Sequence, residues 1–93
     1  MSDVRDKQFW ELADSFIQLA NSHLNEVKPS KVSASALFAA SRFNAFVITA
    51  SASSKEQLIA EKEAAIAYFL EQYETMLREN IDEHLARYDQ PTS

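Results

Sequence analysis

The chain has 93 residues, 46% of them hydrophobic and 25% charged, and this is the composition of one small folded domain. The absence of cysteine and glycine excludes disulfides, thiolate metal sites and a cysteine nucleophile, and also the glycine-rich loops that bind phosphates. The net charge is −5 and there is no basic patch, so we expect binding neither to nucleic acids nor to anionic membranes.

We predict a single helical domain over residues 1–93. Residues 2–7 are mostly charged and no apolar stretch follows them, which indicates a cytoplasmic protein without a signal peptide.

The first predicted helix covers about residues 3–26. Its apolar positions recur at helical spacing and are Phe9, Leu12, Ala13, Phe16, Leu19, Ala20 and His23. Asp3 and Asp6 suit the positive end of the helix dipole. Pro29 is expected to end this helix, because the residue before a proline is disfavoured in the α region. The linker is then Val27–Ser30.

The second predicted helix covers about residues 31–52, with Ser30 or Ser33 as its N-cap. The face expected to pack in the core consists of Val32, Ala36, Ala39, Ala40, Phe43, Val47 and Ala50. Arg42 is the only charged residue between Val32 and Ser54. A helix that is apolar over most of its circumference is usually buried on several sides. A membrane span is the competing interpretation, and a central Arg42 argues against it.

The third predicted helix covers about residues 54–88 and begins with a capping box, formed either by Ser53 with Glu56 or by Ser54 with Gln57. Its apolar residues are Leu58, Ile59, Ala65, Ile66, Phe69, Leu70, Tyr73, Met76, Leu77, Ile81 and Tyr88. At roughly 35 residues it would be about 50 Å long, against about 30–36 Å for the other two helices. The excess length requires either a bend near Asn80 or packing of the end of the helix on another chain.

Short connections between helices predict antiparallel neighbours. The expected fold is therefore all-α, an up-down-up three-helix bundle whose long third helix favours a homodimer.

Neither histidine lies in a recognisable catalytic pattern. His23 with Glu26 offers two metal ligands without a matching second pair, and His84 continues the apolar pattern of the third helix. A lone histidine in such a position indicates packing more often than chemistry. We therefore predict no enzyme activity, no catalytic residues, no cofactor and no metal site.

Phe38, Arg42 and Phe46 follow one another at intervals of four residues, which places them on one strip of the second helix. A guanidinium between two rings can make cation–π contacts, and these residue types are enriched at binding hot spots. The strip is a candidate for partner binding. The alternative is a face covered by the protein's own third helix, with Arg42 paired to a carboxylate.

For self-association the candidates are Tyr73, Asn80, His84 and Tyr88. A single buried asparagine can fix the register of paired helices. In the alternative interpretation, Asn80 lies in water where the bundle frays.

Two stretches carry a resemblance to a known family: Phe9–Asp14, and Lys31–Ser33 followed by Ala39–Phe46. The chain resembles a family of short bacterial proteins known only as a domain of unknown function, from about Gln8 to about Asn80. The resemblance implies a bacterial cytoplasmic origin and no activity, cofactor or site residue.

The sequence favours a non-enzymatic protein-interaction module that associates with itself. A second partner would be another protein, of unknown identity. Two alternatives stay open. One is a helical bundle that binds a small ligand, and the other is a metal-binding protein built on carboxylates and histidine.

Overall fold

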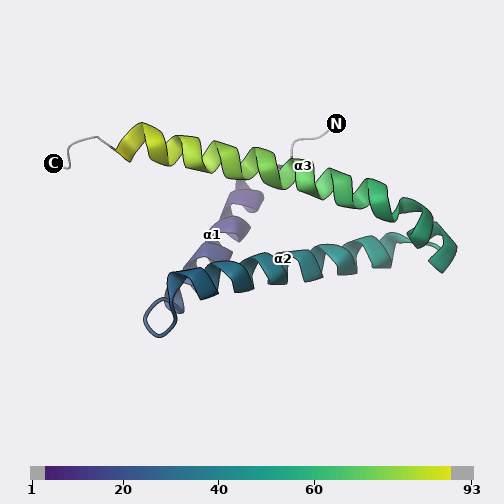
Figure 1. The fold of residues 1–93 in the computed structure, drawn as a ribbon, viewed down its shortest axis with the longest axis horizontal. Helices are drawn as coiled ribbons and strands as arrows, with labels where there is room; N and C mark the ends of the chain where they lie inside the picture. The colour runs from purple at the N-terminus through teal and green to yellow at the C-terminus, as the bar shows by residue number, and fades with distance from the viewer. Residues whose placement is uncertain (1–3, 89–93) are drawn as a thin grey trace. The chain divides into compact units, whose positions relative to one another are not determined.

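The computed structural model describes residues 4–88 and consists of three α-helices, α1 (Lys7–Ser22), α2 (Pro29–Ser51) and α3 (Lys55–Tyr88) (Figure 1). No strand occurs among these residues. The prediction of an all-α chain with three helices, the third of them long, is therefore confirmed. The chain divides into two compact units, Met1–Val47 and Ile48–Ser93, and the boundary between them falls within α2.

Helix α1 is shorter than predicted at both ends. Asp6 is its N-cap, with an extended backbone (φ −87°, ψ −174°), and its Oδ1 accepts a hydrogen bond from the Phe9 N–H at 2.9 Å. Because a capping residue lies outside the helix, α1 begins at Lys7 rather than near residue 3; Asp3 itself lies outside the described residues. At the other end, the N–H of His23 donates to Ala20 O at 3.1 Å, and the chain continues in turns through residue 26.

Pro29 begins α2 instead of ending the preceding helix, so this prediction was wrong. A proline at the first helical position has no N–H, and that N–H would lack a partner within the helix anyway. The N–H groups of Lys31 and Val32 both donate to the carbonyl of Lys28, at 3.0 and 3.1 Å. The predicted N-caps Ser30 and Ser33 therefore both lie inside α2.

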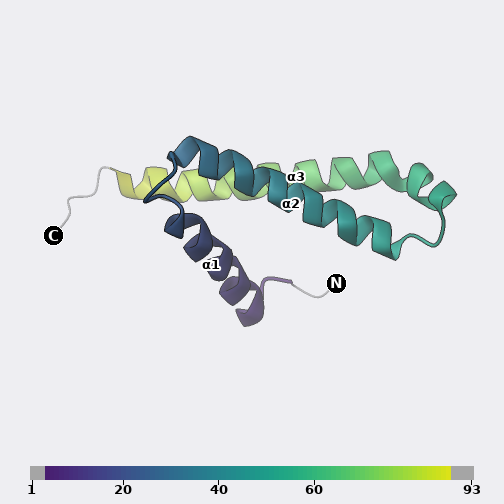
Figure 2. The same ribbon diagram turned by 90° about the horizontal axis from the view of Figure 1, so that it is seen from below.

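The second of the two predicted pairs, Ser54 with Gln57, caps the start of α3, with the return bond of the Gln57 side chain going to Ser53 rather than to Ser54. The N–H of Gln57 donates to Ser54 Oγ at 3.1 Å, and Gln57 Oε1 accepts the N–H of Ser53 at 2.5 Å. From there α3 continues for 34 residues without a break, as its single green-to-yellow coil shows in Figure 2. The alternative in which the helix bends near Asn80 is thus wrong.

No residue in the part of the chain that the structure describes is fully buried. Half-buried side chains mark the face of each helix that is best shielded from solvent. On α2 these include Asn44 and Ile48, whereas the predicted core residues Phe43 and Val47 are 65% and 47% exposed. Of the seven residues predicted for this face of α2, Val32 is half-buried and the other six are exposed, so the prediction was wrong for most of the face.

Candidate functional site

Helix α3 has two apolar faces rather than one. Its half-buried apolar residues are Leu58, Ala65, Phe69 and Met76, which are spaced by seven, four and seven residues and so share one face. A second set of apolar residues is exposed. We call it the apolar stripe of α3, and its members are Ile66, Leu70, Tyr73, Leu77, Ile81, Leu85 and Tyr88.

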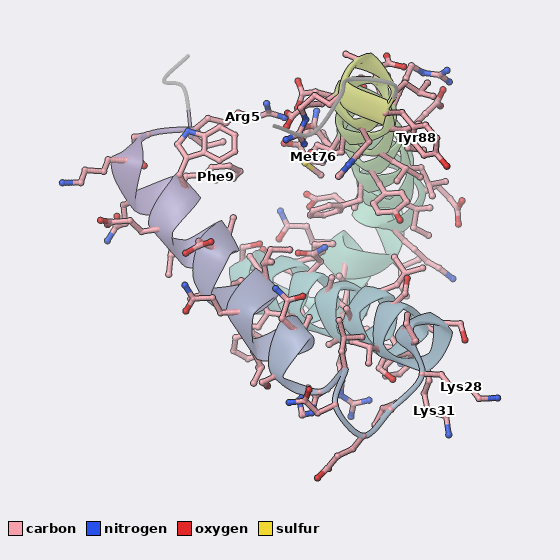
Figure 3. The ribbon with its side chains drawn as sticks, turned by 90° about the vertical axis from the view of Figure 1, so that its left-hand side faces the viewer. Arg5, Phe9, Lys28, Lys31, Met76 and Tyr88 are labelled. Atoms are coloured by element: carbon pink, nitrogen blue, oxygen red, sulfur yellow. The ribbon has the colours of Figure 1, made fainter. Side chains whose placement is uncertain are left out.

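The apolar stripe stays on one face along its whole length. Its members lie on average about 3.7 residues apart, close enough to the 3.6-residue period that the stripe hardly drifts around the helix. Their exposed fractions lie between 43% for Ile66 and 83% for Tyr88. Ile59, which is 64% exposed, extends the same face toward the start of α3. Figure 3 shows Met76, from the half-buried face, and Tyr88, from the stripe, leaving α3 on different sides.

Two of the four predicted self-association residues, Tyr73 and Tyr88, belong to this stripe and are exposed. His84 is exposed and lies seven residues after Leu77, which places it on the same face. Asn80 lies beside the stripe, and its Nδ2 donates a hydrogen bond to the carbonyl of Met76 at 2.8 Å.

Sequence reasoning treated the apolar pattern of α3 as a single stripe and omitted Leu85. The position of Leu85, four residues after Ile81, was the signal that could have added it. The separation into two faces required the exposed fractions, because both sets are apolar and differ only in what covers them.

A charged pair lines the edge of the stripe near its middle. Arg78 donates to Glu74 Oε2 at 2.7 Å, and both side chains are 69% exposed. The hydrogen bond and the negative charge of Glu74 raise the pKa of Arg78 above its usual value. A second pair, Glu83 with Arg87, lies nine residues closer to the end of α3, with an N–O distance of 3.2 Å. Exposed pairs at this spacing contribute little to stability.

The predicted strip of α2 is exposed, with Phe38 at 62% and Phe46 at 65%. The ring of Phe46 contacts that of Phe43, with centroids 6.0 Å apart and planes tilted by 37°. Among residues 4–88, the side chain of Arg42 forms no hydrogen bond, ion pair or ring contact. The cation–π contact that is observed joins Arg5 to Trp10, at 5.7 Å from the ring centroid.

By length and composition alone α2 satisfies the requirements for a membrane span, as core helices of soluble proteins also do. Arg42 and Asn44 lie near its middle, where a charged side chain in lipid is costly.

Two further features of the described residues bear on function: groups of side chains that could bind a metal ion and hollows that could hold a ligand. No group of three or more His, Asp or Glu side chains comes together within residues 4–88. His23 is the C-cap of α1 and His84 lies on the exposed face of α3. A shallow, open hollow on α3 is lined by Leu77, Arg78, Ile81 and Asp82, and so coincides with the middle of the apolar stripe.

Comparison with known proteins agrees with the resemblance found in the sequence. A family model described as "Protein of unknown function (DUF3144)" matches residues 9–85. No curated protein matches the chain. The NMR structure of the protein NB7890A from Shewanella sp. is 30% identical, with a TM-score of 0.77, and the match covers 94% of this chain and 93% of that one. Neither comparison names an activity.

Proposed function

Because the chain belongs to the DUF3144 family, whose members have no assigned function, we propose a function from its surface: it is a non-enzymatic protein-interaction module that associates with a second copy of itself. The observation that carries the proposal is the apolar stripe of α3. The proposed location of this module is the cytoplasm.

Exposure of the stripe is the physical reason for self-association. Moving one leucine or isoleucine side chain from water into a packed interface is favourable by about 1.5–3 kcal/mol. Leu70, Leu77, Ile81 and Leu85 are each between 44% and 65% exposed, so much of that free energy is still available. Contiguous apolar surface of this kind marks interaction sites. A closed dimer is the commonest way in which a protein covers such a surface with its own copy.

A second interaction is supported by the strip of α2. Phe38 and Phe46 expose their rings on either side of Arg42, whose guanidinium has no partner among the described residues. A different protein that offers a carboxylate between two apolar groups would satisfy this strip. The other two candidate functions, a small-ligand bundle and a carboxylate–histidine metal protein, have no comparable observation in their favour.

The test of self-association is the solution mass, measured by light scattering on a sizing column over a wide range of concentrations. We expect the mass of a dimer for the natural chain and a monomer for Leu77→Glu, which puts a charge in the middle of the stripe. Thr75→Glu is the matched control, because Thr75 is exposed on the opposite side of α3. A natural chain that stays monomeric at every concentration would refute the proposal.

A further inference from the structure

The apolar stripe of α3 is nearly symmetric about Leu77. Tyr73 and Ile81 lie four residues before and after Leu77, and Ile66 and Tyr88 lie eleven residues before and after it. Leu70 lies seven residues before, and its counterpart Leu85 eight residues after. The stripe therefore reads almost the same in both directions along the helix. This property allows a helix to be paired with a reversed copy of itself without losing apolar contacts.

We propose that two copies of the chain pair their α3 helices antiparallel, with a two-fold axis at Leu77. This inference rests on the proposed self-association and adds its geometry. Leu77 meets Leu77 of the second copy once, on the axis, while Tyr73 meets Ile81 and Ile66 meets Tyr88, each of these two pairs occurring twice. Such an interface is isologous, as closed two-fold symmetry requires.

The charged pair beside Leu77 fits this orientation. In the antiparallel arrangement Glu74 lies at the height of residue 80 of the second copy and Arg78 at the height of its residue 76, so Glu74 and Arg78 of opposite copies are displaced by two residues along the helix. Two residues correspond to about 3 Å along the helix, which the long side chains of Glu74 and Arg78 can span. Each Arg78 can then share its guanidinium between Glu74 of its own helix, at 2.7 Å, and Glu74 of the second copy.

A parallel pair in register would lose this complementarity. The two-fold axis would then run along the helices and place the Glu74–Arg78 pairs of the two copies on opposite edges of the interface, so Arg78 of one copy could not reach Glu74 of the other. Parallel pairing would also align the two helix dipoles, which antiparallel pairing opposes. Asn80 does not favour the parallel orientation, because its amide already donates a hydrogen bond to Met76 in its own helix.

Cysteine cross-linking distinguishes the two orientations, and the natural chain has no cysteine to interfere. In an antiparallel dimer, residue 66 of one copy lies about 33 Å from residue 66 of the other, since 22 residues at 1.5 Å separate it from residue 88. Disulfides need Cα atoms within about 7 Å. A mixture of Ile66→Cys and Tyr88→Cys proteins should therefore form the mixed disulfide about tenfold faster than either protein links to itself.

Leu77→Cys and Thr75→Cys show whether a negative result means that the orientation is wrong or that no dimer forms. Leu77→Cys should cross-link in either orientation, while Thr75→Cys, on the opposite side, should link only at the slow rate of random collision. Each reduced variant is first checked for helicity by circular dichroism and for mass by light scattering. Self-linking of Ile66→Cys and of Tyr88→Cys, with Leu77→Cys also linked, would show a parallel dimer and overturn this inference alone. A monomeric mass without linkage at residue 77 would overturn the proposed function as well.

Discussion

The side-chain amide of Asn80 donates a hydrogen bond to the carbonyl of Met76, one turn earlier in α3, at 2.8 Å. One N–H of the amide therefore has its partner within its own helix. The hydrogen bond also explains how a polar residue is accommodated beside an apolar stripe without breaking α3. Its own contribution to helix stability is small, because such back-bonding competes with the regular helical geometry.

Asn80→Ala should leave self-association unchanged and stabilise α3 slightly. Alanine is a better helix former than asparagine by roughly 0.5 kcal/mol, and no contact outside the helix is lost. Light scattering checks that self-association is unchanged, and urea unfolding followed by circular dichroism measures the gain in stability. Dissociation of a dimer on this substitution would show that Asn80 contacts the second copy after all.

Asp6→Ala should lower the free energy of unfolding by about 1 kcal/mol, because the N–H of Phe9 would lose the acceptor that caps α1. Asp6→Asn is the matched control, since asparagine is an equally good N-cap. Thermal unfolding by circular dichroism compares the two variants. Equal loss in both would mean that the charge, rather than the capping hydrogen bond, holds this end of the helix.

Ser54→Ala should cost about 1 kcal/mol at the start of α3, because Ser54 Oγ accepts the N–H of Gln57. Ser54→Asp should retain most of the stability, since aspartate also caps well and lies at the positive end of the helix dipole. Urea titration gives both values. If Ser54→Ala unfolds like the natural chain, the capping box contributes nothing measurable to α3.

Arg42→Ala should change the free energy of unfolding by less than about 0.5 kcal/mol, as is usual for exposed positions without a specific contact. The guanidinium has no partner among residues 4–88, so helicity should stay intact while binding to a partner through the strip weakens. Circular dichroism checks the helicity. Full loss of helicity would instead make Arg42 a structural residue and end its candidacy for partner contact.

Glu74→Arg and Arg78→Glu should each weaken self-association, by a fewfold up to about tenfold, and a mixture of the two variants should restore it. In the antiparallel arrangement each single variant brings like charges together, whereas the mixed dimer again sets Glu opposite Arg. Light scattering at low and high salt measures the effect, which should shrink as salt screens the charges. A mixture as weak as its components would argue that these side chains do not meet across the interface.

Local signals in the sequence were enough to predict that there are three helices and where each of them approximately lies. The capping box at Ser54 and Gln57 and the acid at Asp6 act through hydrogen bonds to residues three positions away, so they are readable without knowledge of the fold. Pro29 shows where local reasoning is ambiguous. A proline is compatible with both the end of one helix and the first residue of the next, and the hydrogen bonds of Lys28 decide for the second.

By itself, the sequence determined that the chain is all-α, that its third helix is long and well capped, and that no assembled catalytic pattern is recognisable. Only the tertiary structure decided which apolar residues are covered. Phe69 and Leu70 are neighbours of similar hydrophobicity, yet Phe69 is half-buried and Leu70 is 65% exposed. The physical reason is that helical periodicity shows which residues share a face of the helix, whereas their burial depends on what packs against that face.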